Sequence, residues 1–264
     1  MSKRARWIAI GAAVAIMLVL LAVATIGSAG APAGKRSPRS SSLAVGTALQ
    51  PRSVPPLGLI DEHGRATSLA AFRGKWVVFA PSMTLCHEVC PLTTGAFMQL
   101  TAQLRQAGLG NRVLVAEVTV DPWRDTPDRL RAYRRLTGAN FTLLTGTQAE
   151  IRRLWKFFGV YYARVPQGNP PDIDWLTHRP ETFDVQHTDG LFILDSAGRE
   201  RMADEGMAGV DGRLSAALRG LLDREGLENL AHPQAPWTAG QVFDDVGELM
   251  SGKAVATARL QPAD

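Results

Sequence analysis

Residues 76–91 read WVVFAPSMTLCHEVCP and contain the strongest indication of the fold. The first four, Trp76–Phe79, are apolar without a break, as expected of a strand covered on both faces of a sheet. Pro91 is typical of the first turn of a helix, where its missing N–H leaves no hydrogen bond unmade. Cys86 and Cys90 therefore lie where a buried strand leads into a helix. Because residues four apart share one face of a helix, we expect the two sulfurs to point the same way.

The same alternation of strand and helix continues to about residue 225. β-Branched and apolar runs predict strands, and capping residues, first-turn prolines and terminal glycines predict helices. The expected strands cover residues 112–120, 141–144, 191–194 and 199–202. Three of the expected helices begin near Pro91, Pro127 and Thr147, and a fourth covers residues 211–222. In the helix after Pro127, the buried face should hold Leu130, Tyr133 and Leu136. Successive βαβ units and a final hairpin and helix predict an α/β, thioredoxin-like three-layer domain with a central mixed sheet.

The N-terminal part of the chain has the features of a membrane anchor. Residues 7–29 carry no charge over 23 residues, enough for a helix to cross a bilayer, and Lys3, Arg4 and Arg6 precede them. The positive-inside rule then keeps the N-terminus in the cytoplasm and places the rest of the chain outside it. A cleaved signal peptide is the alternative. A lipid anchor is not expected, because no cysteine lies near the end of the apolar run.

These features divide the chain into four predicted parts. Residues 1–30 form the anchor or signal, residues 31–52 a flexible linker, residues 53–225 the thioredoxin-like domain, and residues 226–264 a loosely attached tail. The formal charge of +4 comes from residues 1–52, which hold seven Lys or Arg and no acid. The rest of the chain has 22 basic and 25 acidic residues and is therefore slightly negative. Nucleic acid is therefore not an expected partner.

The two cysteines are the only ones in the chain, so they can pair with each other or share a metal with another kind of ligand. Outside the cytoplasm a disulfide between them could persist, and an inert structural disulfide is the plain alternative. Near a helix N-terminus, positive partial charge favours the thiolate over the thiol. Thiolates select soft ions such as Cu(I), or Zn(II) in tetrahedral geometry. A third ligand must then come from elsewhere in the fold.

Five histidines are candidates for that third ligand. His187 lies just before the expected strand at residues 191–194, on a loop that should close over the start of the first helix. His87 stands between the cysteines, but a helical neighbour of Cys86 points about 100° away from it. The sequence therefore favours His187. The other candidates are expected to be exposed or structural: His63, His178 and His232.

Three blocks of sequence resemble the Sco/SenC family in the same order: CHEVCP at residues 86–91, VTVDPWRDTP at residues 118–127 and VQHT at residues 185–188. The resemblance covers roughly residues 50–225. It implies a thioredoxin-like protein that is tethered to the membrane outside the cytoplasm and binds copper, as Cu(I) or Cu(II). It also implies a role in assembling the binuclear copper site of cytochrome c oxidase, whose copper-accepting subunit would be the partner. The copper ligands implied by the resemblance are Cys86, Cys90 and His187.

The chain departs from the family pattern beside these residues. The family usually has Pro-Asp inside the CxxxC motif, where this chain has His87 and Glu88. Glu88 keeps a carboxylate that can act from outside the ligand set, and His87 adds a further candidate ligand or proton carrier. Gln186 replaces the acid commonly found before the histidine.

Copper delivery is the leading functional hypothesis, with Cu(I) held by Cys86, Cys90 and His187 and passed on by exchange of thiolate ligands. The alternative is a thiol–disulfide reductase acting on the cysteines of the same target, in which Cys86 attacks and Cys90 resolves the mixed disulfide. That reaction does not need His187. A peroxide-reducing activity is less well supported, because no Arg can be placed beside Thr84 from the sequence alone.

Overall fold

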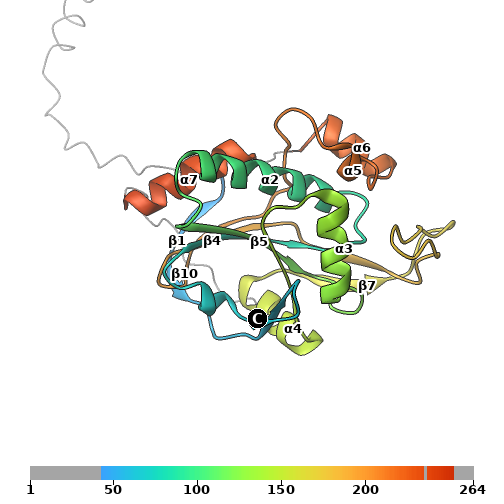
Figure 1. Ribbon diagram of the computed structural model, residues 1–264, viewed down its shortest axis with the longest axis horizontal. Coiled ribbons are helices and arrows are strands. Elements are labelled where there is room, and N and C mark those ends of the chain that lie inside the picture. Colours follow the sequence, from blue (N-terminus) through green and yellow to red (C-terminus); the bar gives the residue numbers. More distant parts are fainter. Residues whose placement is uncertain (1–42, 235–236, 253–264) are drawn as a thin grey trace, which may run out of the picture. The chain divides into compact units, whose positions relative to one another are not determined.

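Strand β4 (Trp76–Ser82) lies in the middle of the sheet that organises the protein (Figure 1). The computed structural model describes residues 43–234 and 237–252. Eight strands form the sheet in the order β1-β10-β9-β4-β5-β6-β2-β3; β4, β5 and β6 are parallel, and β9 is antiparallel to β4. The sheet is therefore mixed, as predicted.

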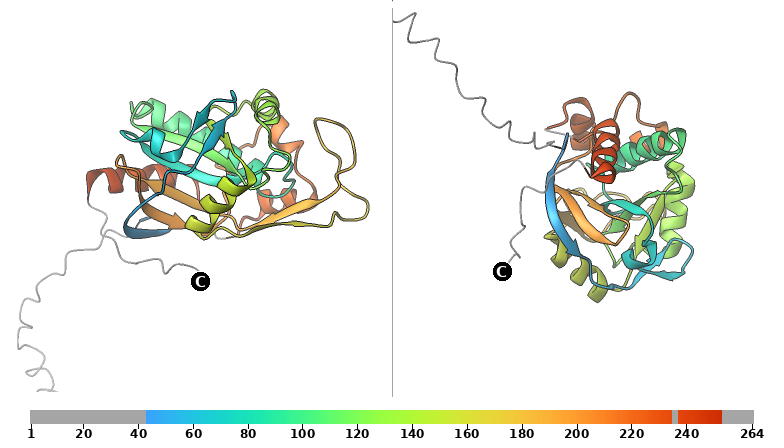
Figure 2. Two further views of the ribbon diagram at one scale, coloured as in Figure 1. Left: turned by 90° about the horizontal axis from the view of Figure 1, so that it is seen from below. Right: turned by 90° about the vertical axis from the view of Figure 1, so that its left-hand side faces the viewer.

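The other strands of this sheet are β1 (Thr47–Ser53), β2 (Leu59–Asp61), β3 (Ala66–Thr67), β5 (Val113–Thr119), β6 (Thr142–Thr145), β9 (Leu191–Leu194) and β10 (Arg199–Asp204). A separate two-stranded sheet pairs β7 (Tyr162–Val165) with β8 (Asp184–His187). The helices are η1 (Leu69–Phe72), α2 (Cys90–Gln106), α3 (Pro127–Thr137), α4 (Gln148–Phe158), α5 (Ala216–Arg219), α6 (Arg224–Ala231) and α7 (Ala239–Ser251). Figure 2 shows the long insertion between β7 and β8 projecting beyond the main sheet.

Helices cover both faces of the sheet and bury two hydrophobic clusters. The first cluster lies under α2, α3 and α7 and includes Phe97 and Trp237, whose rings are in contact. The second lies under α4, where Trp155 packs with Phe79 and Phe192. In Figure 1, α2 and α7 lie above the sheet and α4 lies below it. This is the three-layer arrangement that the sequence predicted.

Helices α3 and α4 begin and end at the residues that the sequence indicated. Thr126 and Thr147 each accept a hydrogen bond from a backbone N–H three residues later, at the starts of α3 and α4. Gly138 and Gly159 end the same two helices in the left-handed conformation, each with a φ of 76°. Glycine adopts this conformation without the strain that a Cβ atom would bring.

Two helix predictions are wrong in part. Leu136 is 42% exposed, because Thr137, one turn after Tyr133, takes the place on the buried face of α3. The helix expected over residues 211–222 is reduced to Ala216–Arg219.

The domain also begins earlier than predicted. Strand β1 starts at Thr47, inside the segment assigned to the linker, and pairs antiparallel with β10. Ala48 and Leu49 are buried, and Arg52 forms an ion pair with Glu200 of β10 at 2.7 Å. A composition rich in Ser, Pro and Arg carries no information about pairing with a strand that is distant in the sequence.

The predicted loose tail at residues 226–264 is wrong for its described part. Helix α7 packs along α2, and its Val242 and Val246 are fully buried in the first hydrophobic cluster. The Asp245 carboxylate accepts two hydrogen bonds, at 2.6 and 2.9 Å, from backbone N–H groups that precede β1. The C-terminal region therefore completes the layer above the sheet. Residues 253–264 lie outside the described part of the chain.

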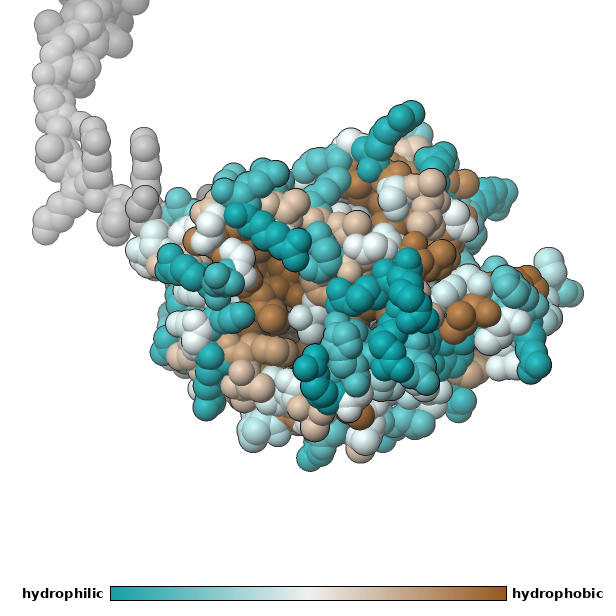
Figure 3. Space-filling view, viewed as in Figure 1, coloured by the Kyte–Doolittle hydropathy of each residue, from teal (hydrophilic) through white to brown (hydrophobic). Residues whose placement is uncertain are grey.

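No helix within residues 43–234 and 237–252 is both long and apolar enough to span a bilayer. The predicted anchor or signal, at residues 1–30, lies outside the described residues. On the face shown in Figure 3, hydrophilic side chains surround a hydrophobic hollow below α2.

Candidate metal centre

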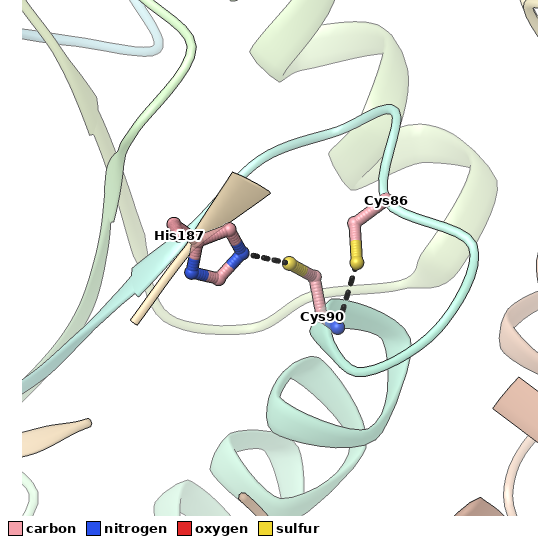
Figure 4. A group of neighbouring side chains, drawn as sticks. All are labelled: Cys86, Cys90 and His187. Atoms are coloured by element: carbon pink, nitrogen blue, oxygen red, sulfur yellow. Dashed lines mark hydrogen bonds between the residues drawn. The ribbon is translucent and has the colours of Figure 1, made fainter. Parts of the chain in front are cut away.

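Cys86, Cys90 and His187 meet at one end of helix α2 (Figure 4). Cys90 is the first residue of α2, Cys86 lies in the loop that follows β4, and His187 ends β8. One sulfur or ring nitrogen from each residue lies within 4.8 Å of the other two. The Cys90 Sγ is 3.5 Å from the His187 Nε2. The structure thus brings together the three residues that the sequence singled out.

Cys86 lies outside the helix, although the sequence analysis expected both cysteines on one helical face. Helix α2 begins at Cys90, and the Val89 side chain does not cap it. If the helix included Cys86, the ring of Pro91 would clash with the carbonyl group of His87, one turn earlier. The Cys86 Sγ instead accepts a hydrogen bond from the Cys90 N–H at 3.3 Å (Figure 4). The sulfur therefore satisfies one of the free N–H groups at the start of the helix.

The two thiols differ in protonation, and no disulfide joins them. A hydrogen bond from the Cys90 thiol holds the pKa of Cys86 well below its ordinary value; His187 and the Cys90 N–H also favour the thiolate, against the effect of burial. Burial raises the pKa of Cys90 well above its ordinary value, and the neighbouring Cys86 sulfur adds to this rise. Of the two thiols, Cys86 is therefore the one that loses its proton first, while Cys90 keeps its proton.

His187 presents its Nε2 to the sulfurs. Its Nδ1–H donates to the carbonyl oxygen of Thr188 at 3.1 Å, and Asp189 Oδ1 lies 3.7 Å from the same nitrogen. A proton held on Nδ1 leaves the Nε2 lone pair for an ion. Burial lowers the pKa of His187, but the hydrogen bond and charge of the Cys86 sulfur outweigh it, and the pKa is raised. Binding of an ion at Nε2 therefore competes with a proton.

A cavity of about 510 Å³ is lined by Cys86 and His187. Among the described residues that line it there is no Lys or Arg, and the exposed Gln186 lies at its edge. Five acidic side chains and one protonated imidazole, that of His87, line it, so the negative charges outnumber the positive one and the cavity favours cations. Its acidic lining residues are Glu88, Asp172, Asp184, Asp189 and Asp223.

Comparison with known proteins places the chain in a family. The family model SCO1/SenC matches residues 46–205. This chain belongs to the SCO1/SenC family. A Stutzerimonas stutzeri protein named for copper binding is 27% identical over 179 residues, which cover 68% of this chain and 75% of that protein. The human mitochondrial SCO2 homolog is 30% identical over 147 residues, or 56% of this chain and 54% of the human protein.

Solved structures agree with this assignment. The solution structure of apo Sco1 from Thermus thermophilus has a TM-score of 0.50 and is 25% identical, covering 70% of this chain and 97% of that one. The region matched by the SCO1/SenC model ends at residue 205, so α5, α6 and α7 lie beyond it.

His87, which the sequence offered as a further candidate ligand or proton carrier, does not face the sulfurs. Its Nδ1–H donates to the carbonyl oxygen of Leu221 at 2.8 Å, and its Nε2–H faces the Glu181 carboxylate at 3.3 Å. Burial lowers the pKa of His87, but these two acceptors outweigh it and raise the pKa to about 9. With both ring nitrogens protonated and bonded to protein acceptors, His87 has no lone pair for a metal. The other histidines are exposed and lie outside the site: His63, His178 and His232.

The sequence analysis missed a buried acidic residue in strand β5. Glu117 accepts a hydrogen bond from the Thr94 hydroxyl at 2.8 Å, and that hydroxyl lies 2.9 Å from the Tyr133 Oη. Burial raises the pKa of Glu117 to about 8. The signal was present in the sequence, since Glu117 is the single acid in the otherwise apolar run from residue 113 to residue 118.

Asp125, from the VTVDPWRDTP block, supports the cysteine loop from inside. Its carboxyl oxygens accept hydrogen bonds from the hydroxyl groups of Thr84 and Thr119, both at 2.6 Å. Burial raises the pKa of Asp125 to about 7. In the same block, Arg124 donates to the Glu181 carboxylate and to the Phe183 carbonyl oxygen, both at 2.8 Å. These family residues hold the loops that carry the cysteines and His187.

Proposed function

We propose that the chain is a membrane-tethered copper carrier outside the cytoplasm that serves the assembly of the binuclear copper site of cytochrome c oxidase. The observation that carries the proposal is the meeting of two sulfurs and one imidazole nitrogen beside an acid-lined cavity. Cu(I) prefers thiolate ligands, and imidazole also suits copper. Membership of the SCO1/SenC family and the copper-binding name of the Stutzerimonas relative support the same conclusion.

The ligand set suits transfer as well as binding. Cu(I) would bind the more acidic sulfur of Cys86, displace the proton from Cys90, and take the Nε2 lone pair of His187. Three protein ligands leave room for an incoming ligand from the acceptor subunit, so the ion can move by stepwise exchange of thiolates. Protons compete for all three ligands, and acid therefore weakens binding.

Cu(I) titration of the reduced full-length protein in detergent tests this proposal. We expect one equivalent to bind tightly. The substitution His187→Ala should weaken binding by more than about 100-fold, beyond the effect typical of residues outside the ligand set. The matched control is His232→Ala, because His232 is exposed and has no role at the site. Equal affinity in the wild type and the His187→Ala protein would exclude a three-ligand copper site.

The membrane tether belongs to the same proposal. The uncharged run at residues 7–29, preceded by three basic residues, supports a single span with the domain outside the cytoplasm. Protease added to intact spheroplasts should then degrade the domain, and the protein should remain with washed membranes. Release of the domain as a shorter soluble form would instead favour cleavage of a signal peptide.

A thiol–disulfide reductase is the second candidate, favoured by the opposite pKa shifts of the two thiols. The Cys86 thiolate would attack one sulfur of a substrate disulfide and release the other as a thiolate. Cys90 would then lose its proton and attack the Cys86 sulfur, which forms the Cys86–Cys90 disulfide and frees the substrate as a dithiol. The reduced Cys86–Cys90 pair of this protein supplies both electrons. Full disulfide reduction by the His187→Ala protein, together with unchanged copper binding, would favour this candidate.

A further inference from the structure

Hydrogen bonds join the loop that carries Cys86 to the insertion between β7 and β8 and to the C-terminal segment. The carbonyl oxygen of Thr84 accepts a hydrogen bond from the indole N–H of Trp175 at 2.7 Å. Farther along the loop, the carbonyl oxygen of His87 accepts one from the Asp223 N–H at 2.9 Å. The His87 ring adds its own bonds to Leu221 and Glu181. His87 is therefore the point where three segments meet.

We propose that His87 is a positioning residue for the copper and thiol chemistry of this chain. It joins the cysteine loop to the C-terminal segment 221–226 on one side and to the insertion between β7 and β8 on the other. Through these links it fixes Cys86 relative to Cys90 and His187. The copper part of this inference rests on the proposed function, whereas the redox part needs only the two cysteines.

The C-terminal segment touches the loop closely through its backbone. A Cβ atom added at Gly226 would lie 2.4 Å from the carbonyl oxygen of His87 and 3.0 Å from that of Glu88. Contacts this short are not tolerated, so only glycine permits the approach. Asp223 contributes twice, since its N–H bonds to His87 and its carboxylate caps α6 by accepting from the Gly226 N–H at 2.7 Å. A segment beyond the region matched by the family model is thus built against the cysteine motif.

The other link leads towards His187. The Glu181 side chain is 1% exposed and bonds to both His87 and Arg124. Arg124 also donates to the carbonyl oxygen of Phe183, immediately before strand β8, which ends at His187. One carboxylate therefore connects the loop of Cys86 to the start of the strand that carries the third candidate ligand.

This arrangement should control two properties of the site. Metal affinity depends on the groups that hold the ligands in place, and their loss typically lowers affinity about 10–100-fold. Disulfide formation requires the two Cβ atoms to approach to about 3.5–4.5 Å, so freedom in the loop changes how easily the cysteines are oxidised. His87 acts on both properties without touching copper or sulfur.

Substitutions in the full-length protein that separately remove the ring bonds of His87 and the backbone contact at Gly226 test this role. His87→Ala removes both ring bonds, His87→Asn places an amide near the position of Nδ1, and His87→Gln places one near Nε2. Gly226→Ala leaves the ring intact but forces the C-terminal segment away from the loop. The matched controls are His232→Ala and Gly247→Ala, because a Cβ atom at Gly247 meets nothing within 4 Å.

For each protein we would measure Cu(I) affinity against a chromophoric chelator and the midpoint potential of the Cys86–Cys90 couple in thiol buffers. We expect His87→Ala and Gly226→Ala to bind Cu(I) at least about tenfold more weakly and to shift the potential in the same direction. His87→Asn and His87→Gln should each recover part of both losses. The controls should match the wild type.

Thermal unfolding of each protein shows whether it is folded at the assay temperature. Wild-type affinity and potential in folded His87→Ala and Gly226→Ala proteins would overturn the inference. It would also be overturned if neither the Asn nor the Gln protein recovered any part of the losses. If the wild type binds no copper while both substitutions still shift the potential, the proposed function fails and the positioning role stands.

Discussion

His87 and His187 both lie close to the cysteines, but hydrogen bonds leave only one of them free to bind an ion. Both ring nitrogens of His87 face protein acceptors, at 2.8 and 3.3 Å. His187 uses Nδ1 for a backbone carbonyl and turns Nε2 towards Cys90. The acceptors around a histidine therefore decide whether it can be a ligand, and adjacency to a cysteine in the sequence does not.

The same difference between free and hydrogen-bonded groups separates the residues around the site into a reactive set and a supporting set. The reactive set, Cys86, Cys90 and His187, keeps lone pairs directed at one another. The supporting set is bonded within the protein and consists of His87, Glu117, Asp125 and Glu181. Substitutions of the buried acids Glu117 and Asp125 in the supporting set should first change stability, whereas changes in the reactive set should first change chemistry. The predictions that follow test this division.

Glu117→Gln should give the largest effect, and the effect should depend on pH. The pKa of Glu117 is raised from 4.5 to about 8 by burial, so the folded state binds the proton more tightly than the unfolded state. Stability is then unaffected below pH 4.5 and is lost as the pH rises from there through about 8. Glutamine keeps the shape and carries no charge, so the variant should be more stable than the wild type above pH 8, by up to about 5 kcal/mol.

Urea unfolding of both proteins between pH 5 and pH 9 measures this difference. The His87 pKa, raised to about 9, adds a further loss of stability over the alkaline range, but it is common to both proteins and cancels. A difference that stayed constant with pH would show that Glu117 is not neutral in the folded protein.

Asp125→Ala should come next, with a loss of about 3 kcal/mol of unfolding free energy. The substitution leaves the buried hydroxyl groups of Thr84 and Thr119 without their acceptor, and each such loss costs about 1–3 kcal/mol. The control is Asp128→Ala, since the Asp128 side chain is 83% exposed and its ion pair with Arg131 is worth less than about 1 kcal/mol. Urea unfolding at pH 6 compares the two. Equal losses of unfolding free energy in the two variants would mean that the hydrogen bonds of Asp125 do not stabilise the cysteine loop.

Sequence reasoning located most of the fold because the decisive signals were local. Thr126 and Thr147 cap their helices, and Gly138 and Gly159 end them, through contacts within a few residues. Strand β1 and helix α7 were misjudged because their stability comes from partners far along the chain. A short segment with a weak pattern becomes ordered when it packs against a part of the chain that is distant in the sequence.

In the candidate site too, local features could be predicted from the sequence and contacts with distant residues could not. Cys86, Cys90 and His187 could be chosen from the sequence, because thiols at a helix start and a histidine before a strand are recognisable. The role of His87 could not be chosen, since Leu221 and Glu181 reach it only in the folded chain. The position of Cys86 outside the helix was predictable from Pro91, whose ring forbids another helical turn before it.

Within the reactive set, alkylation should distinguish the two cysteines. In the reduced, metal-free protein, Cys86 has a lowered pKa and Cys90 a raised one, so a larger fraction of Cys86 than of Cys90 is thiolate at any given pH. Each unit of pKa separation changes the thiolate fraction about tenfold, and iodoacetamide should modify Cys86 more than about ten times faster. Peptide mass mapping after brief treatment identifies the site.

The pH profile separates ionisation from access, because Cys86 is also slightly more exposed than Cys90. The rate for Cys86 should level off well below pH 9. A rate that climbed through pH 9 for both cysteines would show that the thiols are equivalent and that access alone ranks them.

The smallest effect should come from the cavity lining, where Asp172→Asn removes one exposed negative charge without touching a candidate ligand. Exposed charges interact through water and are screened, so the loss in Cu(I) affinity should be below about fivefold at low salt and disappear near 1 M salt. Asp211→Asn, an exposed acid that does not line the cavity, should have no effect at either salt concentration. A loss that persisted at high salt would mean that Asp172 acts through a direct bond, and it would then belong to the reactive set.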